Sequence, residues 1–148
     1  GVQQFLDLGI PASKLVLGVP WYGYDYPCVL NPTNHSQFEF CPIRAVPFRG
    51  APCSDAAGSE VCYAQLMPML DTPAVGGRRW DNNTMSPYFN FVSPADNTMH
   101  QMWYDDPESL AFKFKAAASL GLGGVGVWNY DCLDYTTNTT KTRSQVLV

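Results

Sequence analysis

Two short apolar segments, separated by roughly a hundred residues, constrain the fold of this 148-residue chain more than any other feature. Residues 15–19 and 125–128 are apolar at consecutive positions, which is typical of strands covered on both faces in a parallel sheet. Each segment follows a helical pattern and a short loop that contains glycine. Helix, loop and apolar strand, repeated once, predict an α/β protein with a parallel sheet.

The predicted helices have recognisable boundaries. Val2 and Phe5 recur at helical spacing, and Gly9 is expected to end this first helix in the left-handed conformation. The second helix begins after Asp106, a typical N-cap that is followed by a proline and a glutamate. We expect this helix to bury one apolar face and to end at Gly121.

Residues 20–104 form a long connection between the two strands, far beyond the roughly 10 to 12 residues that a crossover needs. They are rich in proline, cysteine, asparagine and aromatic residues, and only residues 61–70 show a helical period. Alternating positions in residues 88–92 and 100–104 predict antiparallel strands. We therefore expect a small α+β subdomain inserted into a βα loop.

The composition is that of a globular protein, because 46% of the residues are hydrophobic and only 15% are charged. Nine basic against thirteen acidic side chains give a net charge of −4, which argues against a nucleic-acid partner. No apolar run reaches the roughly 18 residues that a membrane span needs. The sequence therefore predicts neither nucleic-acid binding nor membrane insertion, and we expect a monomer.

The chain contains five cysteines: Cys28, Cys41, Cys53, Cys62 and Cys132. None lies in a C-x-x-C pair and there are only two histidines, so neither a zinc site nor another metal or cofactor is predicted. Cys28 with Cys41, and Cys53 with Cys62, are candidates for local disulfides, although spacing alone leaves the connectivity open.

Three N-glycosylation acceptor sequences accompany the cysteines, at Asn34, Asn82 and Asn138. Each alone is a frequent chance match, but together with the cysteines they favour an oxidising secretory compartment. The chain starts inside a helical pattern, without an initiator methionine or a signal peptide. We therefore expect it to be part of a larger protein that is lysosomal or secreted.

Three stretches carry a resemblance to a known family. Residues 15–23 read LVLGVPWYG and resemble the seventh barrel strand of the family-18 glycoside hydrolases, the chitinases and their relatives. Residues 104–110, YDDPESL, and residues 121–128, GLGGVGVW, resemble the seventh helix and the eighth strand of that family. The resemblance extends over roughly residues 1–135 and is loose in the insertion.

The resemblance implies the C-terminal part of a (β/α)8 TIM barrel, with the α+β insertion between the seventh strand and the seventh helix. It divides the chain into barrel segment 1–19, insertion 20–104, barrel segment 105–135 and a divergent tail 136–148. The tail has poor helix formers and no apolar stripe, so we expect it to be disordered. One alternative is that the isolated chain folds poorly, because two of eight strands standing alone would leave unpaired backbone edges and exposed apolar faces.

The same resemblance implies hydrolysis of β-linked N-acetylglucosamine, in the chitobiose core of N-linked oligosaccharides or in chitin oligomers. In that family the acetamide of the substrate attacks the anomeric carbon while a glutamic acid protonates the leaving oxygen. This glutamate ends a D-x-x-D-x-D-x-E run on the fourth strand, and no such run occurs in the 148 residues. We expect the chain to supply part of a sugar pocket without its acid; the alternative is a non-catalytic carbohydrate-binding protein.

The resemblance singles out three candidate sugar-binding residues. Trp128 ends the eighth strand, where the matching family position forms the floor beneath the cleaved sugar; the alternative is a core tryptophan. Tyr22 matches a family tyrosine whose ring and hydroxyl reach the sugar, or else is a buried tyrosine. Trp21 replaces a smaller family residue and is expected to narrow the groove for short substrates. Tyr24 stands where relatives have an arginine, which implies different contacts at the outer subsites.

Four other residues are open to two interpretations. Asp105 and Asp106 form a pair that could serve acid–base catalysis, but a helix cap and a charge at the helix N-terminus explain them without chemistry, and we favour that interpretation. Trp80 and Trp103 lie in the insertion, where composition does not distinguish a groove wall from internal packing.

Overall fold

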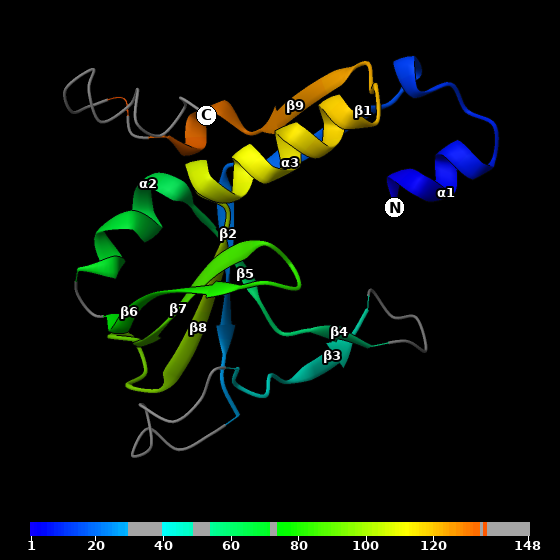
Figure 1. Ribbon diagram of the computed structural model, residues 1–148. Coiled ribbons are helices and arrows are strands. Elements are labelled where there is room, and N and C mark those ends of the chain that lie inside the picture. Colours follow the sequence, from blue (N-terminus) through cyan, green and yellow to red (C-terminus); the bar gives the residue numbers. More distant parts are fainter. Residues whose placement is uncertain (30–39, 49–53, 72–73, 134, 136–148) are drawn as a thin grey trace.

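The computed structural model describes residues 1–29, 40–48, 54–71, 74–133 and 135. The helices are α1 (Val2–Asp7), α2 (Tyr63–Leu66) and α3 (Pro107–Ser119), with 3-10 turns at Ala12–Lys14, Met67–Leu70 and Tyr130–Cys132. The strands are β1 (Val16–Pro20), β2 (Tyr22–Pro27), β3 (Ala45–Pro47), β4 (Ser54–Ala56), β5 (Ser59–Cys62), β6 (Ala74–Asp81), β7 (Ser86–Val92), β8 (Met99–Tyr104) and β9 (Gly124–Trp128). They form a parallel pair, a five-stranded antiparallel sheet and a small hairpin, β3–β4 (Figure 1).

The parallel pair consists of β1 and β9, which confirms that the two apolar segments are adjacent and parallel. Val19 lies opposite Val127 and Pro20 opposite Trp128, so the two strands end at the same edge. Val19 is buried, whereas Val16, on the other face of β1, is 63% exposed. The expectation that β1 is covered on both faces is therefore wrong for this chain, because its own residues pack against one face only.

Helix α3 lies against this pair and begins and ends as its sequence predicts (Figure 1). The carboxylate of Asp106 accepts a hydrogen bond from the backbone N–H of Ser109 at 3.0 Å, and Ser109 Oγ accepts one from the N–H of Asp106 at 2.9 Å. These bonds satisfy amide groups that have no partner within the helix. Gly121 follows the helix with a φ of 62°, the left-handed conformation that glycine adopts without strain.

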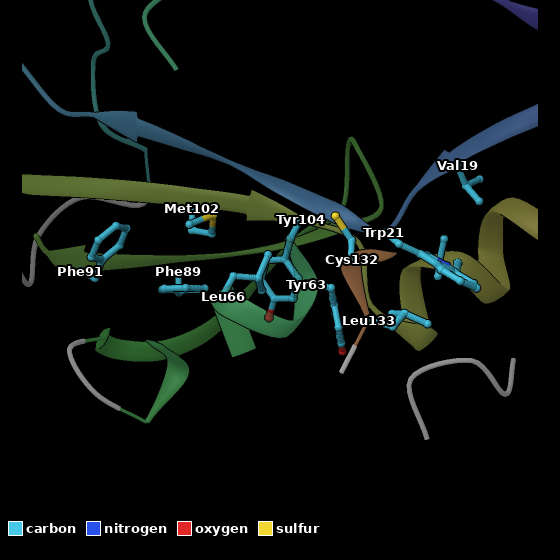
Figure 2. Packing of buried hydrophobic residues seen from close by; sticks show 11 residues of the cluster. Val19, Trp21, Tyr63, Leu66, Phe89, Phe91, Met102, Tyr104, Cys132 and Leu133 are labelled. Atoms are coloured by element: carbon cyan, nitrogen blue, oxygen red, sulfur yellow. The ribbon is translucent and has the colours of Figure 1, made fainter. Parts of the chain in front are cut away.

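The five-stranded sheet has the order β5-β2-β8-β7-β6 and contains the two antiparallel strands that alternation predicts. One face of the sheet packs against α2 and the turn that follows it, where Leu66, Phe89 and Met102 are fully buried (Figure 2). The helical period over residues 61–70 corresponds to the end of β5, α2 and a 3-10 turn. The core continues from this sheet to Trp21 and Val19 at the end of β1.

A disulfide joins the sheet to the parallel pair. Cys62, at the end of β5, is bonded to Cys132, just after β9, across 70 residues of sequence. The expected bond between Cys53 and Cys62 is therefore wrong; Cys53 itself lies outside the described residues. The physical reason is that β5 pairs with β2, which brings Cys62 to the junction with β9. The expected bond between Cys28 and Cys41 is confirmed.

Among the helices of the described residues, none combines the length and apolar content needed to cross a membrane. Within the same residues, no three His, Cys, Asp or Glu side chains gather into a group that could hold a metal ion. The predicted disordered tail, residues 136–148, lies outside the described part of the chain.

Candidate functional site

The candidate site lies where β1 and β9 end together. Neighbouring residues of a strand point to opposite faces, and Val19 and Val127 point toward the core. Pro20 and Trp128, their paired neighbours, therefore point to the other face. Trp128 is 66% exposed, and the peptide bond that follows it is cis. Within this chain its indole is a surface group, available to a ligand.

Trp21 lies on the opposite face from Trp128. Its side chain belongs to the core and does not face the proposed sugar groove. Its side chain is only 6% exposed and packs edge-to-face against Tyr130, with ring centroids 5.2 Å apart. Its backbone joins the strands, because its N–H donates to the carbonyl oxygen of Trp128 at 2.6 Å. The expectation that Trp21 narrows the groove is corrected: the residue follows Pro20 by one position and so points into the core.

Tyr22 is partly buried against that core and also lines an open pocket of about 200 Å³. We call this pocket the aromatic groove; the residues that define it are Pro20, Tyr22, Tyr24, Tyr26, Trp103, Thr84, Ser86 and Asp105. Burial raises the pKa of the Tyr22 hydroxyl, and the nearby Glu60 and Tyr24 raise it further. The hydroxyl is therefore protonated at neutral pH and can both donate and accept a hydrogen bond.

Three tyrosines of β2 form one wall of the aromatic groove. Tyr22, Tyr24 and Tyr26 alternate along the strand and so share a face. Their ring centroids follow one another at 6.0 and 5.7 Å, and the rings of Tyr24 and Tyr26 are stacked. Gly58 lies against this wall, since a Cβ there would come within 2.6 Å of the Tyr26 ring. Replacing Gly58 would displace the wall.

Trp103 faces Tyr24 across the β2–β8 pair and is held by a chain of hydrogen bonds. Its Nε1 donates to Gln101 Oε1 at 2.9 Å, and Gln101 Nε2 donates to Asn90 Oδ1 at 2.8 Å. Trp103 is thus a groove residue that composition alone left undecided; strand alternation and the pairing with Tyr24 are the signals that place it. Trp80, by contrast, packs against Phe112 and lies under Arg78, outside the aromatic groove.

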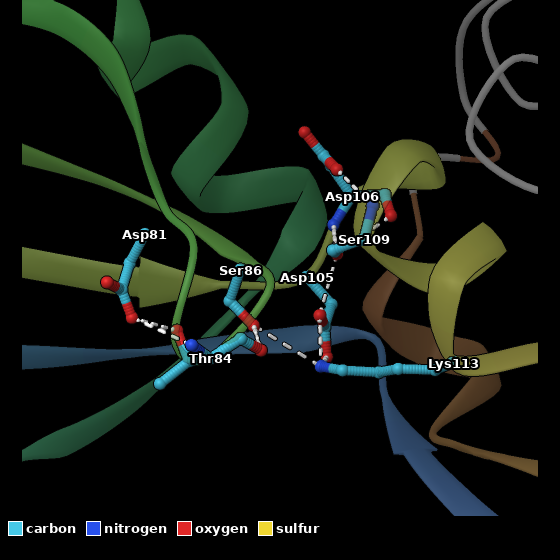
Figure 3. A network of polar contacts seen from close by, with 7 residues as sticks. All are labelled: Asp81, Thr84, Ser86, Asp105, Asp106, Ser109 and Lys113. Carbon is cyan, nitrogen blue, oxygen red and sulfur yellow. Dashed lines mark hydrogen bonds and ion pairs between the residues drawn. The ribbon is translucent and has the colours of Figure 1, made fainter. Parts of the chain in front are cut away.

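One polar residue that lines the aromatic groove is a buried carboxylate, Asp105. Figure 3 shows the polar contacts that surround it. Asp105 is 4% exposed, accepts a hydrogen bond from Ser109 Oγ at 2.7 Å and is ion-paired with Lys113. Lys113 Nζ also lies 3.4 Å from Ser86 Oγ, so the network links β8, α3 and the start of β7. Both oxygens of Asp105 already contact Lys113. This arrangement favours a structural role for the carboxylate over a role as a general acid or base.

Asp106 is the helix cap, as expected, and has a second role. Its Oδ1 caps α3, while its Oδ2 accepts from Arg78 Nε of β6 at 2.9 Å. The favoured interpretation of the acid pair is therefore confirmed for Asp106. For Asp105 it is replaced by a buried ion pair, because that side chain points inward from the end of β8 (Figure 3).

The turn between β6 and β7 forms the rim of the aromatic groove and carries one glycosylation acceptor. Thr84 donates from its N–H and its Oγ1 to Asp81 Oδ2, at 2.9 and 2.7 Å, and these bonds lower the pKa of Asp81. Asn82 is exposed in this turn. Asn34 and Asn138 lie outside the described residues.

The sequence matches the profile of glycosyl hydrolases family 18 over residues 1–132. It is 46% identical over 135 residues to mouse di-N-acetylchitobiase, an alignment that covers 91% of this chain and 35% of that protein. For human di-N-acetylchitobiase the identity is 44%, with 91% and 34% covered. Chitinase B of Serratia marcescens is 30% identical, with 86% and 27% covered. The chain thus spans about a third of the length of the chitobiases it matches.

Solved structures share the fold. A family GH18 chitinase from Cycas revoluta in complex with (GlcNAc)3 superposes with a TM-score of 0.65 at 22% identity, covering 89% of this chain and 33% of that one. Human YKL-39, described as a pseudo-chitinase with retained chitooligosaccharide binding, gives a TM-score of 0.64 at 22% identity, with 91% and 33% covered. At this identity the likeness establishes the α/β architecture alone.

Proposed function

Because the chain belongs to glycosyl hydrolase family 18, we propose that it is the C-terminal part of a (β/α)8 barrel glycosidase that cleaves β-linked N-acetylglucosamine. In this arrangement β1 and β9 are the seventh and eighth barrel strands, α3 is the seventh helix, and the five-stranded sheet belongs to the insertion between strand and helix. Active sites of such barrels lie at the carboxyl ends of the strands, where Trp128 is found here.

The position of Trp128 at the shared end of β1 and β9, on the face opposite the core residues Val19 and Val127, is the observation that carries the proposal. An indole offers a large rigid apolar face to the C–H groups of a pyranose and loses little conformational entropy when it binds. Tyr22 follows on the same side of the chain and supplies a protonated hydroxyl. Pro20 links the two, because it pairs with Trp128 in the sheet and lines the aromatic groove beside Tyr22. In the proposed site Trp128 is the stacking floor and Tyr22 the hydrogen-bonding wall.

The substrate class follows from the relatives. Proteins named di-N-acetylchitobiase are 46% and 44% identical to this chain over 135 residues, well above the 30% of a bacterial chitinase. We therefore propose a chitobiose unit, as in the core of N-linked oligosaccharides or in short chitin oligomers, as the substrate. The acetamide of the sugar would act as the nucleophile, and the chain's contribution is to bind and orient it.

The proton donor is expected outside these 148 residues, because they contain no D-x-x-D-x-D-x-E run. Asp105 does not replace it, since Lys113 and Ser109 hold its carboxylate. The runner-up function, a non-catalytic carbohydrate-binding protein, requires that the matching glutamate be another residue in the full-length protein. The residue at the position of the family glutamate in the full-length protein therefore distinguishes the glycosidase from the carbohydrate-binding protein.

The test is hydrolysis of a chitobiose-containing substrate by the full-length protein and its Trp128→Ala variant. We expect the variant to fold normally and to lose at least tenfold in kcat/KM, because loss of the stacking floor misplaces the reacting sugar. Trp80→Ala, outside the aromatic groove, is the matched control. Near-normal kinetics of Trp128→Ala would contradict the proposal, as would turnover by residues 1–148 alone.

We also propose that the protein matures in the secretory pathway as a glycosylated monomer of the lysosome or the extracellular space. Two disulfides support an oxidising compartment. Exposure of Asn82 in a surface turn makes it accessible to glycosylation. A mass shift on peptide-N-glycosidase treatment, lost in Asn82→Gln, would support modification at this position.

A further inference from the structure

Phe40, which does not itself line the aromatic groove, stacks on a residue that does. The ring of Phe40 stacks against the Trp103 indole, with centroids 5.7 Å apart and planes 12° apart, and against Tyr88 at 5.4 Å. Tyr88 also stacks on Trp103 at 4.7 Å. Phe40 and Tyr88 therefore take stacking positions on Trp103 that a pyranose ring would otherwise use.

Phe40 is anchored by covalent and backbone contacts. The next residue, Cys41, is bonded to Cys28, which directly follows β2. The N–H of Cys28 donates to the carbonyl oxygen of Met99, the first residue of β8, at 2.9 Å. Through the neighbouring Cys41, Phe40 is therefore held near the end of β2 and the start of β8, the two strands that carry the aromatic groove.

Burial alone does not account for Phe40. The ring is 50% exposed, whereas Tyr88, on which it stacks, is 2% exposed. A ring left half in water gains only part of the free energy of full burial. What the fixed ring does achieve is to cover aromatic surface of Trp103, a lining residue of the groove that lies opposite Tyr24.

We propose that Phe40 closes the aromatic groove at Trp103 and thereby limits the length of glycan that the site accepts. The inference rests on the proposed function, because it takes the ligand to be an N-acetylglucosamine oligomer. A short glycan fits between the end of β9 and Trp103, whereas a longer one meets the phenyl ring where its next sugar would stack. Phe40 is therefore a specificity-determining residue that acts through exclusion.

The test measures binding of N-acetylglucosamine oligomers of two to six units to the full-length protein by calorimetry. In the unmodified protein, affinity should stop rising at a short length. In Phe40→Ala, the longest oligomers should bind about three- to tenfold more tightly, the gain expected for one added aromatic stacking contact, while the dimer is unchanged. Phe40→Tyr, which retains the ring, should behave like the unmodified protein.

Phe112→Ala is the matched control, since Phe112 is a similarly exposed phenylalanine on α3, outside the groove. Weaker binding of long oligomers by Phe40→Ala would overturn the proposal and make Phe40 a sugar platform instead; unchanged length dependence would overturn it as well. Because Phe40→Ala removes only a half-exposed ring, loss of folding, read by circular dichroism, would make Phe40 a structural residue and also contradict the inference. If no oligomer binds the unmodified protein, the proposed function itself fails.

Discussion

The two adjacent acids at the start of α3 have different roles because their side chains point in different directions. Asp106 is partly buried, and its two oxygens cap the helix and meet Arg78. Asp105 is buried and depends on Lys113 for a counter-charge. A buried carboxylate without such a partner loses its hydration, and no favourable charge interaction offsets that desolvation free energy. Lys113 therefore stabilises the buried carboxylate that lines the aromatic groove.

We expect Lys113→Met to lower the free energy of unfolding by about 1–3 kcal/mol, because it leaves the Asp105 charge buried and unpaired. The lower part of the range applies if water reaches the pair, since the Lys113 side chain is 29% exposed. Adding Asp105→Asn to this variant should recover part of the loss. Urea denaturation checks both, with Lys115→Met as the control; equal losses in the two lysine variants would contradict the role of the pair.

The tryptophans show how far a residue's place can be predicted from sequence. Trp128 lies at the end of its strand, on the open face, as its resemblance to the family implies. Trp21 was expected in the same groove, but it lies one position past Pro20, and strand geometry sends it into the core. The contact of Trp103 with Phe40 was not predictable, because the two residues are far apart in sequence and meet only through the folded insertion.

The elements at the two ends of the chain follow local rules, and this explains why they were predictable. The N-cap, the proline and the closing glycine define α3 without reference to the rest of the fold. Strand β6 was missed because Gly76 and Gly77 interrupt its alternation at an irregular register. The order β5-β2-β8-β7-β6 depends on pairings between distant segments, which a single sequence does not encode in any local pattern.

At the start of α3, one oxygen of Asp106 caps the helix and the other pairs with Arg78, so substitutions can distinguish the two contributions to stability. Asp106→Ala removes the cap and the ion pair with Arg78, and should cost about 1–2 kcal/mol in the free energy of unfolding. Asp106→Asn retains an oxygen that can accept from the N–H of Ser109, so it should cost less than about 1 kcal/mol. Thermal or urea unfolding measures the difference. A loss in Asp106→Asn as large as in Asp106→Ala would show that the ion pair, not the cap, stabilises this helix end.

The molecule as a whole is held together at the junction between the parallel pair and the insertion. Cys62 and Cys132 close a loop of 70 residues, whereas Cys28 and Cys41 are 13 residues apart. Chain-entropy arguments give the longer loop about 4 kcal/mol of stabilisation and the shorter one about 3 kcal/mol. The longer bond also fixes the end of β9, and with it Trp128, relative to the sheet that carries the aromatic groove.

We therefore expect the Cys62→Ala/Cys132→Ala double variant to be less stable than Cys28→Ala/Cys41→Ala, by roughly 1 kcal/mol in denaturant unfolding. It should also weaken oligosaccharide binding, because the floor and the wall of the site are no longer joined. A smaller loss for the Cys62–Cys132 bond, with binding unaffected, would mean that the two parts hold together without it.

The central claim is that a sugar binds at the shared end of β1 and β9, against Trp128. The most direct measurement uses the full-length protein and follows by NMR the indole N–H signals of the four tryptophans in residues 1–148 while an N-acetylglucosamine trimer is added. We predict that the signals of Trp128 and Trp103 shift, while those of Trp21 and Trp80 stay in place, because only the first two lie along the proposed path. Saturable binding that leaves the Trp128 signal unmoved, or that shifts Trp21 or Trp80 most, would contradict the claim.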